Sequence, residues 1–177
     1  LLAKGLVIPE QEGDWIFYYA CPRDNSDLHA ETPERHVCRV CKRVFTDART
    51  QAAYRTMLYE HADGQIVQLA QAYAVSSDER YAVAVRDALL KLARLYPTFT
   101  RHDRWGRRGF LAVVGGRRYA QHLDEAFAVI KLAGAYDLVA TASCFSADTR
   151  RIIEEGLLGF IAREILGLQG FIGGQNN

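Results

Sequence analysis

The fold is decided by residues 76–97, which read SSDERYAVAVRDALLKLARLYP. The opening residues, Ser76-Ser-Asp-Glu79, match a capping box, in which a polar side chain and a Glu satisfy the free N–H groups at a helix start. Pro97 cannot continue a helix and marks its end. Apolar residues between these signals recur at helical spacing on one face, at Tyr81, Val85, Leu89 and Leu92. The stretch predicts an amphipathic helix to about Leu95.

Helical periodicity also extends toward the N-terminus. Residues 47–61 are expected to form one helix, with Thr46 or Asp47 as its N-cap. Residues 65–75 are expected to form a second, whose inner face carries Ile66, Leu69, Ala70 and Tyr73. Gly64 lies between them and predicts a break or kink, because glycine is a poor residue for a helix interior.

Two more helices are expected after Pro97. Residues 97–116, which contain four glycines, read as a loop. A long helix from about Arg117 to Val139 follows, and its apolar stripe is Leu123, Phe127, Ile130 and Leu138. Ser146 is expected to cap the last helix. Its inward-facing residues are Ile152, Ile153, Leu157, Phe160 and Ile161.

The expected helices repeat as hairpins. Ala72-Tyr73 followed by Ser76 resembles Ala135-Tyr136 followed by Ser146, and each unit reads as a helix, a turn and a capped return helix. Helical hairpins bury their apolar faces against neighbouring hairpins. Two or three hairpins are too few to close a ring. We therefore expect a mainly α fragment, truncated at both ends, whose helical part covers residues 47–177.

Residues 1–46 differ from the rest. They contain a group of aromatic residues, three of the four cysteines and several turn-forming residues. Residues 16–20, Ile-Phe-Tyr-Tyr-Ala, read as a short strand that enters a small irregular module. The composition predicts a separate aromatic and cysteine-rich unit ahead of the helices.

The cysteines of this unit have a metal-ligand spacing. Cys38-Arg-Val-Cys41 is a CxxC turn, which places two thiolates on one tetrahedral ion. Cys21-Pro-Arg-Asp24 supplies the matching half, with Asp in the fourth position. His36 and His29 are alternative fourth ligands. The pattern predicts a structural zinc knuckle; a disulfide with a free thiol, or three ordinary thiols, are the other interpretations. Cys144 is distant and reads as a packed residue.

The overall composition excludes some classes of protein. The chain is 49% apolar and 24% charged, with a net charge of +1, so a nucleic-acid-coating protein is not expected. It contains no apolar run long enough to span a membrane and no recognisable leader. Localisation cannot be read from the residues themselves.

Positive charge is concentrated in one region. Residues 94–118 contain seven arginines and one acid, Asp103, so this region carries +6 and the remainder of the chain −5. Arginine forks bind carboxylate, sulfate or phosphate, and aromatic rings stack on sugars. We expect an anionic ligand here rather than only a solvated loop with Trp105 packed in the core. The candidate binding residues are Arg104, Trp105, Arg107, Arg108 and Arg117.

Polar residues on either side of the loop extend the candidate site. Gln121 and His122 follow the arginines, and His122 could act as an acid or base. Asp124 and Glu125 are neighbours that favour a helix N-terminus. The chain ends in an amide cluster after two glycines, and amides donate hydrogen bonds without charge. Its members are Gln175, Asn176 and Asn177.

Taken in order, these motifs resemble the N-terminal helical part of heparinase II/III-type polysaccharide lyases. The resemblance covers most of the chain, although each motif is short. The motifs are Tyr18-Tyr-Ala-Cys21-Pro, His36-Val-Cys38-x-x-Cys41, Leu95-Tyr-Pro97, Arg104-Trp-Gly-Arg107, Gly115-Gly-Arg117, Gln121-x-Leu-Asp-Glu125-Ala and Gly174-Gln-Asn-Asn177. One departure is Asp24, where a fuller cysteine pair would be expected.

The resemblance implies an incomplete (α/α) toroid followed, further along the same protein, by β-sandwich domains. It implies β-elimination on a uronate polymer such as a heparin-like glycosaminoglycan or alginate. Amide donors would stabilise the charge that develops beside the sugar carboxylate. Asn177, with Asn176 as the alternative, would supply this role. Tyr and His residues further downstream would transfer the protons, so the fragment alone is expected to be inactive.

The resemblance also bears on location and cofactors. Relatives of this kind would be periplasmic, secreted or cytoplasmic bacterial proteins, and no organic cofactor is expected. Two other functions remain open at this point. One is a toroid-type glycoside hydrolase, which needs two carboxylates flanking the bond, whereas Asp124 and Glu125 share one helical turn. The other is a non-enzymatic zinc-knuckle and helical module that binds an anionic polymer.

Overall fold

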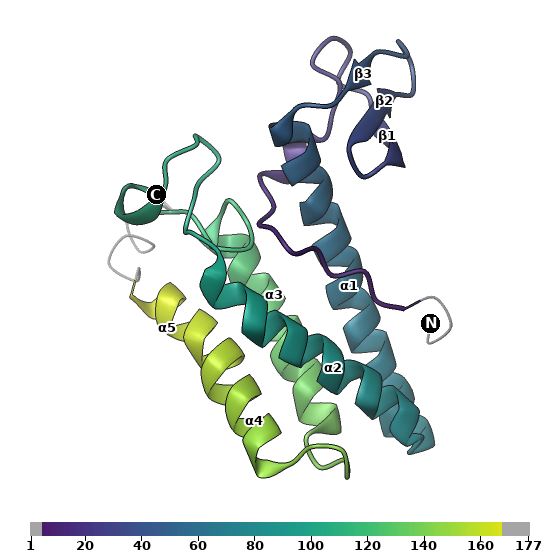
Figure 1. Ribbon diagram of the computed structural model, residues 1–177, viewed down its shortest axis with the longest axis vertical. Coiled ribbons are helices and arrows are strands. Elements are labelled where there is room, and N and C mark those ends of the chain that lie inside the picture. Colours follow the sequence, from purple (N-terminus) through teal and green to yellow (C-terminus); the bar gives the residue numbers. More distant parts are fainter. Residues whose placement is uncertain (1–4, 168–177) are drawn as a thin grey trace.

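The computed structural model describes residues 5–167. It is mainly helical, with a small three-stranded sheet at one end (Figure 1). The elements are α1 (Ala48–Ser76), α2 (Glu79–Leu95), α3 (His122–Val139), α4 (Ala147–Ile153) and α5 (Gly159–Leu166). A π-helical turn at Glu154–Leu158 joins α4 to α5 without a break in direction. The mainly α prediction is confirmed, whereas closure into a toroid is not shown.

Helix α1 corrects the prediction of a break at Gly64. It runs for 29 residues through that glycine, because its buried positions on both sides pack into the core. Burial of Ile66 and Leu69 outweighs the unfavourable helix propensity of one glycine, about 1 kcal/mol. Asp47 is the N-cap, and its carboxylate accepts the N–H of Thr50 at 3.0 Å.

The four residues of the expected capping box belong to two helices: Ser76 and Ser77 end α1, and Asp78 and Glu79 begin α2. Ser77 ends α1 in the left-handed region with φ 57°, and its N–H donates to Tyr73 O at 2.7 Å. Asp78, rather than a serine, caps α2 by accepting the N–H of Arg80 at 3.0 Å. The predicted helix itself, Glu79–Leu95, is confirmed, and Pro97 lies in a short 3-10 turn at Tyr96–Thr98.

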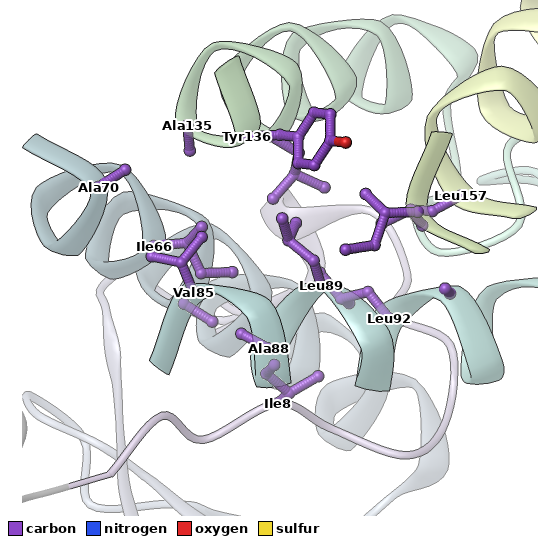
Figure 2. Packing of buried hydrophobic residues seen from close by; sticks show 14 of the residues in the cluster. Ile8, Ile66, Ala70, Val85, Ala88, Leu89, Leu92, Ala135, Tyr136 and Leu157 are labelled. Atoms are coloured by element: carbon purple, nitrogen blue, oxygen red, sulfur yellow. The ribbon is translucent and has the colours of Figure 1, made fainter. Parts of the chain in front are cut away.

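The helices form two hairpins, α1–α2 and α3–α4–α5, that share one core. Figure 2 shows Leu89 and Leu92 of α2 lying between α1, α3 and the last helical segment. Tyr136 of α3 and Leu157 of the π-helical turn reach the same cluster. The repeated hairpin organisation predicted from the sequence is therefore present.

Helix α3 differs from the predicted helix in its first residue and in the face that it buries. It begins at His122, so residues 117–121 are not helical. The predicted apolar stripe is exposed: Leu123 is 52% exposed, Phe127 57%, Ile130 67% and Leu138 42%. The small side chain of Ala128 lies instead on the buried face, with Leu132, Ala135, Tyr136 and Val139. Small residues on that face allow α1 and α3 to approach closely.

The last helical segment follows its prediction with one exception. Ser146 caps α4, and its hydroxyl accepts the N–H of Thr149 at 3.1 Å. Ile153, Leu157 and Ile161 are buried as expected. Ile152 is 46% exposed, because consecutive helical residues point about 100° apart and only its neighbour faces the core.

The N-terminal module, residues 5–46, which we also call the cysteine module, contains an antiparallel sheet that the sequence did not indicate. Its strands are β1 (Leu28–Thr32), β2 (Arg35–Cys38) and β3 (Val44–Phe45), in that order. Residues 16–20, which were expected to form a strand, contain a 3-10 turn at Ile16–Tyr18 instead. Residues 8–14 extend along the helices, where Ile8 joins the helical core and Gly13 N–H donates to Arg118 O at 2.8 Å.

Within residues 5–167, no helix has both the length and the apolar composition needed to cross a lipid bilayer.

Candidate functional site

The N-terminal module holds two matching turns. In each turn the first residue and the fourth residue present a side chain to the same point: Cys21 and Asp24 in one, Cys38 and Cys41 in the other. The fifth residue of each has positive φ, 54° at Asn25 and 62° at Lys42. Its N–H donates to the carbonyl of the first residue, at 2.8 Å and 3.2 Å. Asp24 therefore occupies the position that Cys41 occupies in the second turn.

The four side chains have the spacing of a tetrahedral metal centre. Their ligand atoms all lie within 4.8 Å of one another. The Cys21 and Cys41 sulfurs are 3.6 Å apart, and Cys38 Sγ is 3.7 Å from each oxygen of Asp24. A zinc ion bound at about 2.3 Å by tetrahedral thiolates sets sulfur–sulfur distances of about 3.8 Å. The cluster is therefore close enough to bind a metal, as the sequence predicted.

Hydrogen bonds around the cluster favour negative charge on it. The Ser26 hydroxyl donates to Asp24 Oδ1 at 2.6 Å and, with the Ser26 N–H, lowers the pKa of Asp24 to about 2. Burial raises the pKa of Cys38, but Ser26 and the N–H of Cys41 outweigh it and bring the value to about 7. A backbone hydrogen bond from Arg43 lowers the pKa of Cys41, but the thiol of Cys38, burial and the thiol of Cys21 together outweigh it and bring the value to about 11. Thiols so close together cannot all ionise without a cation between them.

The alternative histidine ligands lie elsewhere. His36 is buried, with Nδ1 3.0 Å from the Tyr19 hydroxyl and Nε2 3.1 Å from Pro33 O, so both ring nitrogens are engaged. His29 lies on β1 and is not part of the cluster. Cys144 packs against the helical core, as expected. Asp24 is thus the fourth ligand that the structure supports.

Most arginines of the arginine-rich loop, residues 97–121, form ion pairs with acids of the same chain. Arg101 and Arg117 both donate to Glu164 Oε2 of α5, at 2.8 Å and 3.0 Å. Burial alone would raise the pKa of Glu164, but these two guanidinium groups hold it below its ordinary value. Arg117 also donates to Phe99 O at 2.8 Å. Two guanidinium groups therefore converge on one carboxylate oxygen.

Two further arginines of the loop are paired with acids. Arg107 donates to Asp103 Oδ2 at 2.6 Å, and Arg108 pairs with Glu12 from the N-terminal segment. Both side chains remain about half exposed, at 49% and 56%. The Arg108–Glu12 pair is open to solvent and contributes about 1 kcal/mol or less, so an external anion can compete for Arg108. Asp103, in contrast, is fully buried beneath Arg107.

A buried centre fixes the loop on the helices. Arg118 is 1% exposed and donates to both carboxylate oxygens of Asp63 in α1, at 3.0 Å and 2.7 Å. Glu125 Oε1 accepts the N–H groups of Arg117 and Tyr119 at 2.9 Å and 3.0 Å, and that of Arg118. Its other oxygen has no hydrogen-bond partner among residues 5–167, and burial raises the pKa of Glu125. This centre holds the backbone from which Arg117 projects.

Arg104 joins the loop to the N-terminal segment through stacked rings. Its guanidinium lies 4.4 Å from the ring centre of Trp105 and 4.9 Å from that of Trp15. Arg107 lies 4.8 Å from the Trp105 ring, and Trp15 meets Tyr18 edge to face at 5.3 Å. We call Trp15, Tyr18, Arg104, Trp105 and Arg107 the arginine–aromatic ladder. Trp105 is 56% exposed, so it is not packed in the core.

A hollow of about 390 Å³ adjoins the converging arginines. Its walls include Phe99, Arg101, Phe110 and Arg117, and Phe110 is 87% exposed. Gly109, with φ 61°, forms part of the floor, and a side chain there would be strained. The hollow combines guanidinium groups with an exposed ring, the pattern that suits an acidic sugar.

The remaining predicted site residues are only partly placed. Gln121 is the N-cap residue of α3 and makes no cap hydrogen bond with its side chain. His122 is half-buried, and its Nδ1 lies 2.8 Å from Val114 O. Gln175, Asn176 and Asn177 lie outside the described residues.

Sequence reasoning missed several parts of this surface. The sequence places Trp15 and Tyr18 in the cysteine module but gives no sign of their contact with the loop. The Tyr18 hydroxyl donates to Arg104 O at 2.7 Å, across 86 residues. Glu164 and Asp63 were not singled out at all. Aromatic residues beside a lone cluster of arginines are a signal for such stacking, but the pairing itself depends on the fold.

Comparison with known proteins adds no relative. No protein-family model matches the chain, and a search of curated proteins finds no significant match.

Proposed function

We propose that this chain is part of a polysaccharide lyase that cleaves a uronate-containing acidic polysaccharide by β-elimination. The observation that carries the proposal is the convergence of Arg101 and Arg117 on one carboxylate oxygen beside the hollow. A uronate presents the same planar carboxylate that Glu164 presents there. Bidentate and paired guanidinium contacts are the strongest protein contacts to such a group.

The arginine–aromatic ladder supports the same substrate class. Trp105 and Phe110 offer exposed rings for sugar stacking, and Arg104 and Arg107 lie over the Trp105 ring. Arg104 has no ion pair with an acid among the described residues. A heparin-like glycosaminoglycan and alginate both carry charges that these guanidinium groups would bind.

In the proposed reaction the carboxylate charge is neutralised so that the neighbouring C5 proton becomes acidic enough to leave. Amide donors in the segment that contains Asn176 and Asn177 would stabilise the developing charge. A base then removes the proton and an acid protonates the departing O4. The base and acid belong, in this proposal, to a downstream part of the same protein with a β-sandwich.

The cysteine module has a structural role in this proposal. The support for zinc is a set of three thiols and one carboxylate whose ligand atoms lie within 4.8 Å of one another, since cysteine and aspartate are both zinc ligands. Cys21, Asp24, Cys38 and Cys41 would hold the ion and join the two turns. The zinc would contribute folding energy to a small module with few buried apolar residues.

A second candidate function is a non-catalytic module that binds an anionic polymer. Most loop arginines pair with Asp63, Asp103, Glu12 or Glu164 and stabilise the fold, and this structural role requires no reaction step. Arg104, which lies over two aromatic rings, would then bind the polymer. This function predicts binding without bond cleavage.

The test is an assay of the whole natural protein on alginate, heparan-type and other uronate polymers, with product read as unsaturated uronate absorbance. The proposal expects product, and expects Arg104→Ala to lower kcat/KM about tenfold, the equivalent of 1.4 kcal/mol. Arg94→Ala, at an exposed arginine on α2, is the control. Binding without product on every polymer would favour the second function, and neither binding nor product would refute both.

A further inference from the structure

A second hollow lies between the cysteine module and the start of α1. It has a volume of about 430 Å³, and its walls include Phe17, Tyr18, Pro22, Arg43, Phe45 and Arg49. We call it the module groove. It lies outside the arginine-rich loop, and the proposed reaction makes no use of it.

The module groove carries cations that the fold does not neutralise. Within the described residues, Arg43 and Arg49 form no ion pair; each lies over a ring, Phe45 at 5.6 Å and Tyr18 at 4.5 Å. Asp47 is the one acid in its wall. Its two oxygens accept the N–H and the hydroxyl of Thr50, at 3.0 Å and 2.8 Å. The wall therefore contains two guanidinium groups and one carboxylate.

The same groove contains an exposed aromatic side chain, and the first turn of α1 forms part of its wall. Phe17 is 71% exposed, although it is a large apolar residue. The N-terminus of α1 opens into the groove at Asp47, Arg49 and Thr50. The Asp47 carboxylate already accepts the Thr50 N–H there, so the helix start itself is occupied by a protein acid. A ring beside two cations suits a sugar that bears a carboxylate or sulfate.

The module groove is continuous with the arginine–aromatic ladder. Tyr18 lines the groove, and its hydroxyl donates to Arg104 O in the loop. Trp15 packs against both Phe17 and Tyr18, at 5.0 Å and 5.3 Å, and under Arg104. One polymer could therefore contact Trp105, Trp15 and the groove in succession.

We propose that the module groove is a further subsite for the acidic polysaccharide, in which Arg43 and Arg49 bind a carboxylate or sulfate and Phe17 stacks on a sugar ring. This inference rests on the proposed function. A glycan is favoured over nucleic acid because the groove continues through Tyr18 into the arginine–aromatic ladder, which the proposed function assigns to an acidic sugar.

The subsite also connects to the metal centre. Cys21 and Pro22 are part of the groove wall, and Cys21 belongs to the metal cluster. A metal that holds Cys21 to Cys38 and Cys41 would keep that wall in position. Removal of the metal is therefore expected to weaken binding in the groove as well as stability of the module.

The test measures binding of alginate and heparin-type oligosaccharides to the purified protein by titration calorimetry. The variant is Arg43→Ala with Arg49→Ala, and Phe17→Ala is tested separately. Arg23→Ala with Arg39→Ala is the matched control, because both are exposed arginines of the same module outside the groove. Metal content and circular dichroism establish that each variant keeps its fold.

We expect the groove variant to bind long oligosaccharides about tenfold or more weakly, and Phe17→Ala about fivefold more weakly, with the control within about twofold of the parent. Unchanged binding by the folded groove variant would overturn the subsite and leave the proposed function standing. Absence of binding by the parent protein to every acidic oligosaccharide would overturn both. Tighter binding of single-stranded RNA, reduced by the groove variant, would overturn the glycan assignment.

Discussion

Replacing Asp63 with alanine tests the buried centre that positions the arginine-rich loop. Asp63 and Arg118 are 2% and 1% exposed and share two hydrogen bonds, and Asp63 also accepts the Tyr119 hydroxyl at 3.2 Å. Removal of one partner leaves a buried charge without its counter-ion, which costs about 3–5 kcal/mol. Loss of the Tyr119 hydrogen bond adds about 1 kcal/mol.

The assay is urea unfolding followed by circular dichroism at neutral pH. With a denaturant dependence of about 2 kcal/mol per molar, a loss of about 4 kcal/mol lowers the unfolding midpoint by about 2 M. Asp87→Ala is the control, since Asp87 is paired with Arg86 at a side-chain exposure of 60% and its loss costs about 1 kcal/mol or less.

A third variant separates charge from packing. Asp63→Leu combined with Arg118→Met removes both charges, and replacing a buried pair by apolar residues is close to neutral. We expect most of the lost stability to return. If Asp63→Ala unfolds at the same urea concentration as Asp87→Ala, the buried pair does not hold the loop in the way described.

Four further predictions follow from single contacts. Gly64→Ala should raise the free energy of unfolding by about 0.5–1 kcal/mol in urea, because α1 is continuous and a Cβ there meets nothing within 4 Å; destabilisation would contradict this. Gly115→Ala should lower it by about 1–3 kcal/mol, because its Cβ would lie 2.1 Å from His102 O; an unchanged midpoint would refute the close approach. The pKa of Glu164 is lowered in the folded protein, so its ion pairs stabilise the fold fully above pH 4.5, the ordinary pKa of a glutamate, and this stabilisation is lost as the pH falls through the lowered pKa. Glu164→Gln should therefore be less stable than the parent at neutral pH and equally stable in acid. A stability difference that does not change with pH would contradict the ion pairs. Asp24→Ala should weaken zinc binding about tenfold or more in a chelator competition, whereas equal affinity would exclude Asp24 as a ligand.

The elements that the sequence predicted well are those with local signals. Residues 79–95 combine a cap, an amphipathic face and a proline stop, and each of these acts within one or two helical turns. The cysteine cluster is likewise local: two turns of four residues present ligands at their first and fourth positions. Asp24 could be proposed from spacing because a tight turn fixes which side chains meet, but the structure was needed to separate it from His29 and His36.

The elements that the sequence could not predict depend on distant parts of the chain. Arg118 pairs with Asp63 across 55 residues, Arg117 with Glu164 across 47 and Arg108 with Glu12 across 96. No spacing rule relates such pairs, so the sequence alone overstates how much unpaired positive charge the loop carries. The exposed stripe of α3 has the same origin, since the face that α1 covers is decided by the packing of small residues such as Ala128.

The most direct measurement for an acidic-sugar surface is a tryptophan fluorescence titration. The chain has two tryptophans, Trp15 and Trp105, and both lie against the Arg104 guanidinium, so the whole tryptophan signal reports on the arginine–aromatic ladder. We predict a saturable change with uronate oligosaccharides, shifted to about tenfold higher concentration by Arg104→Ala and absent with neutral dextran. An unchanged spectrum with every uronate oligosaccharide, or an equal response to dextran, would contradict the account.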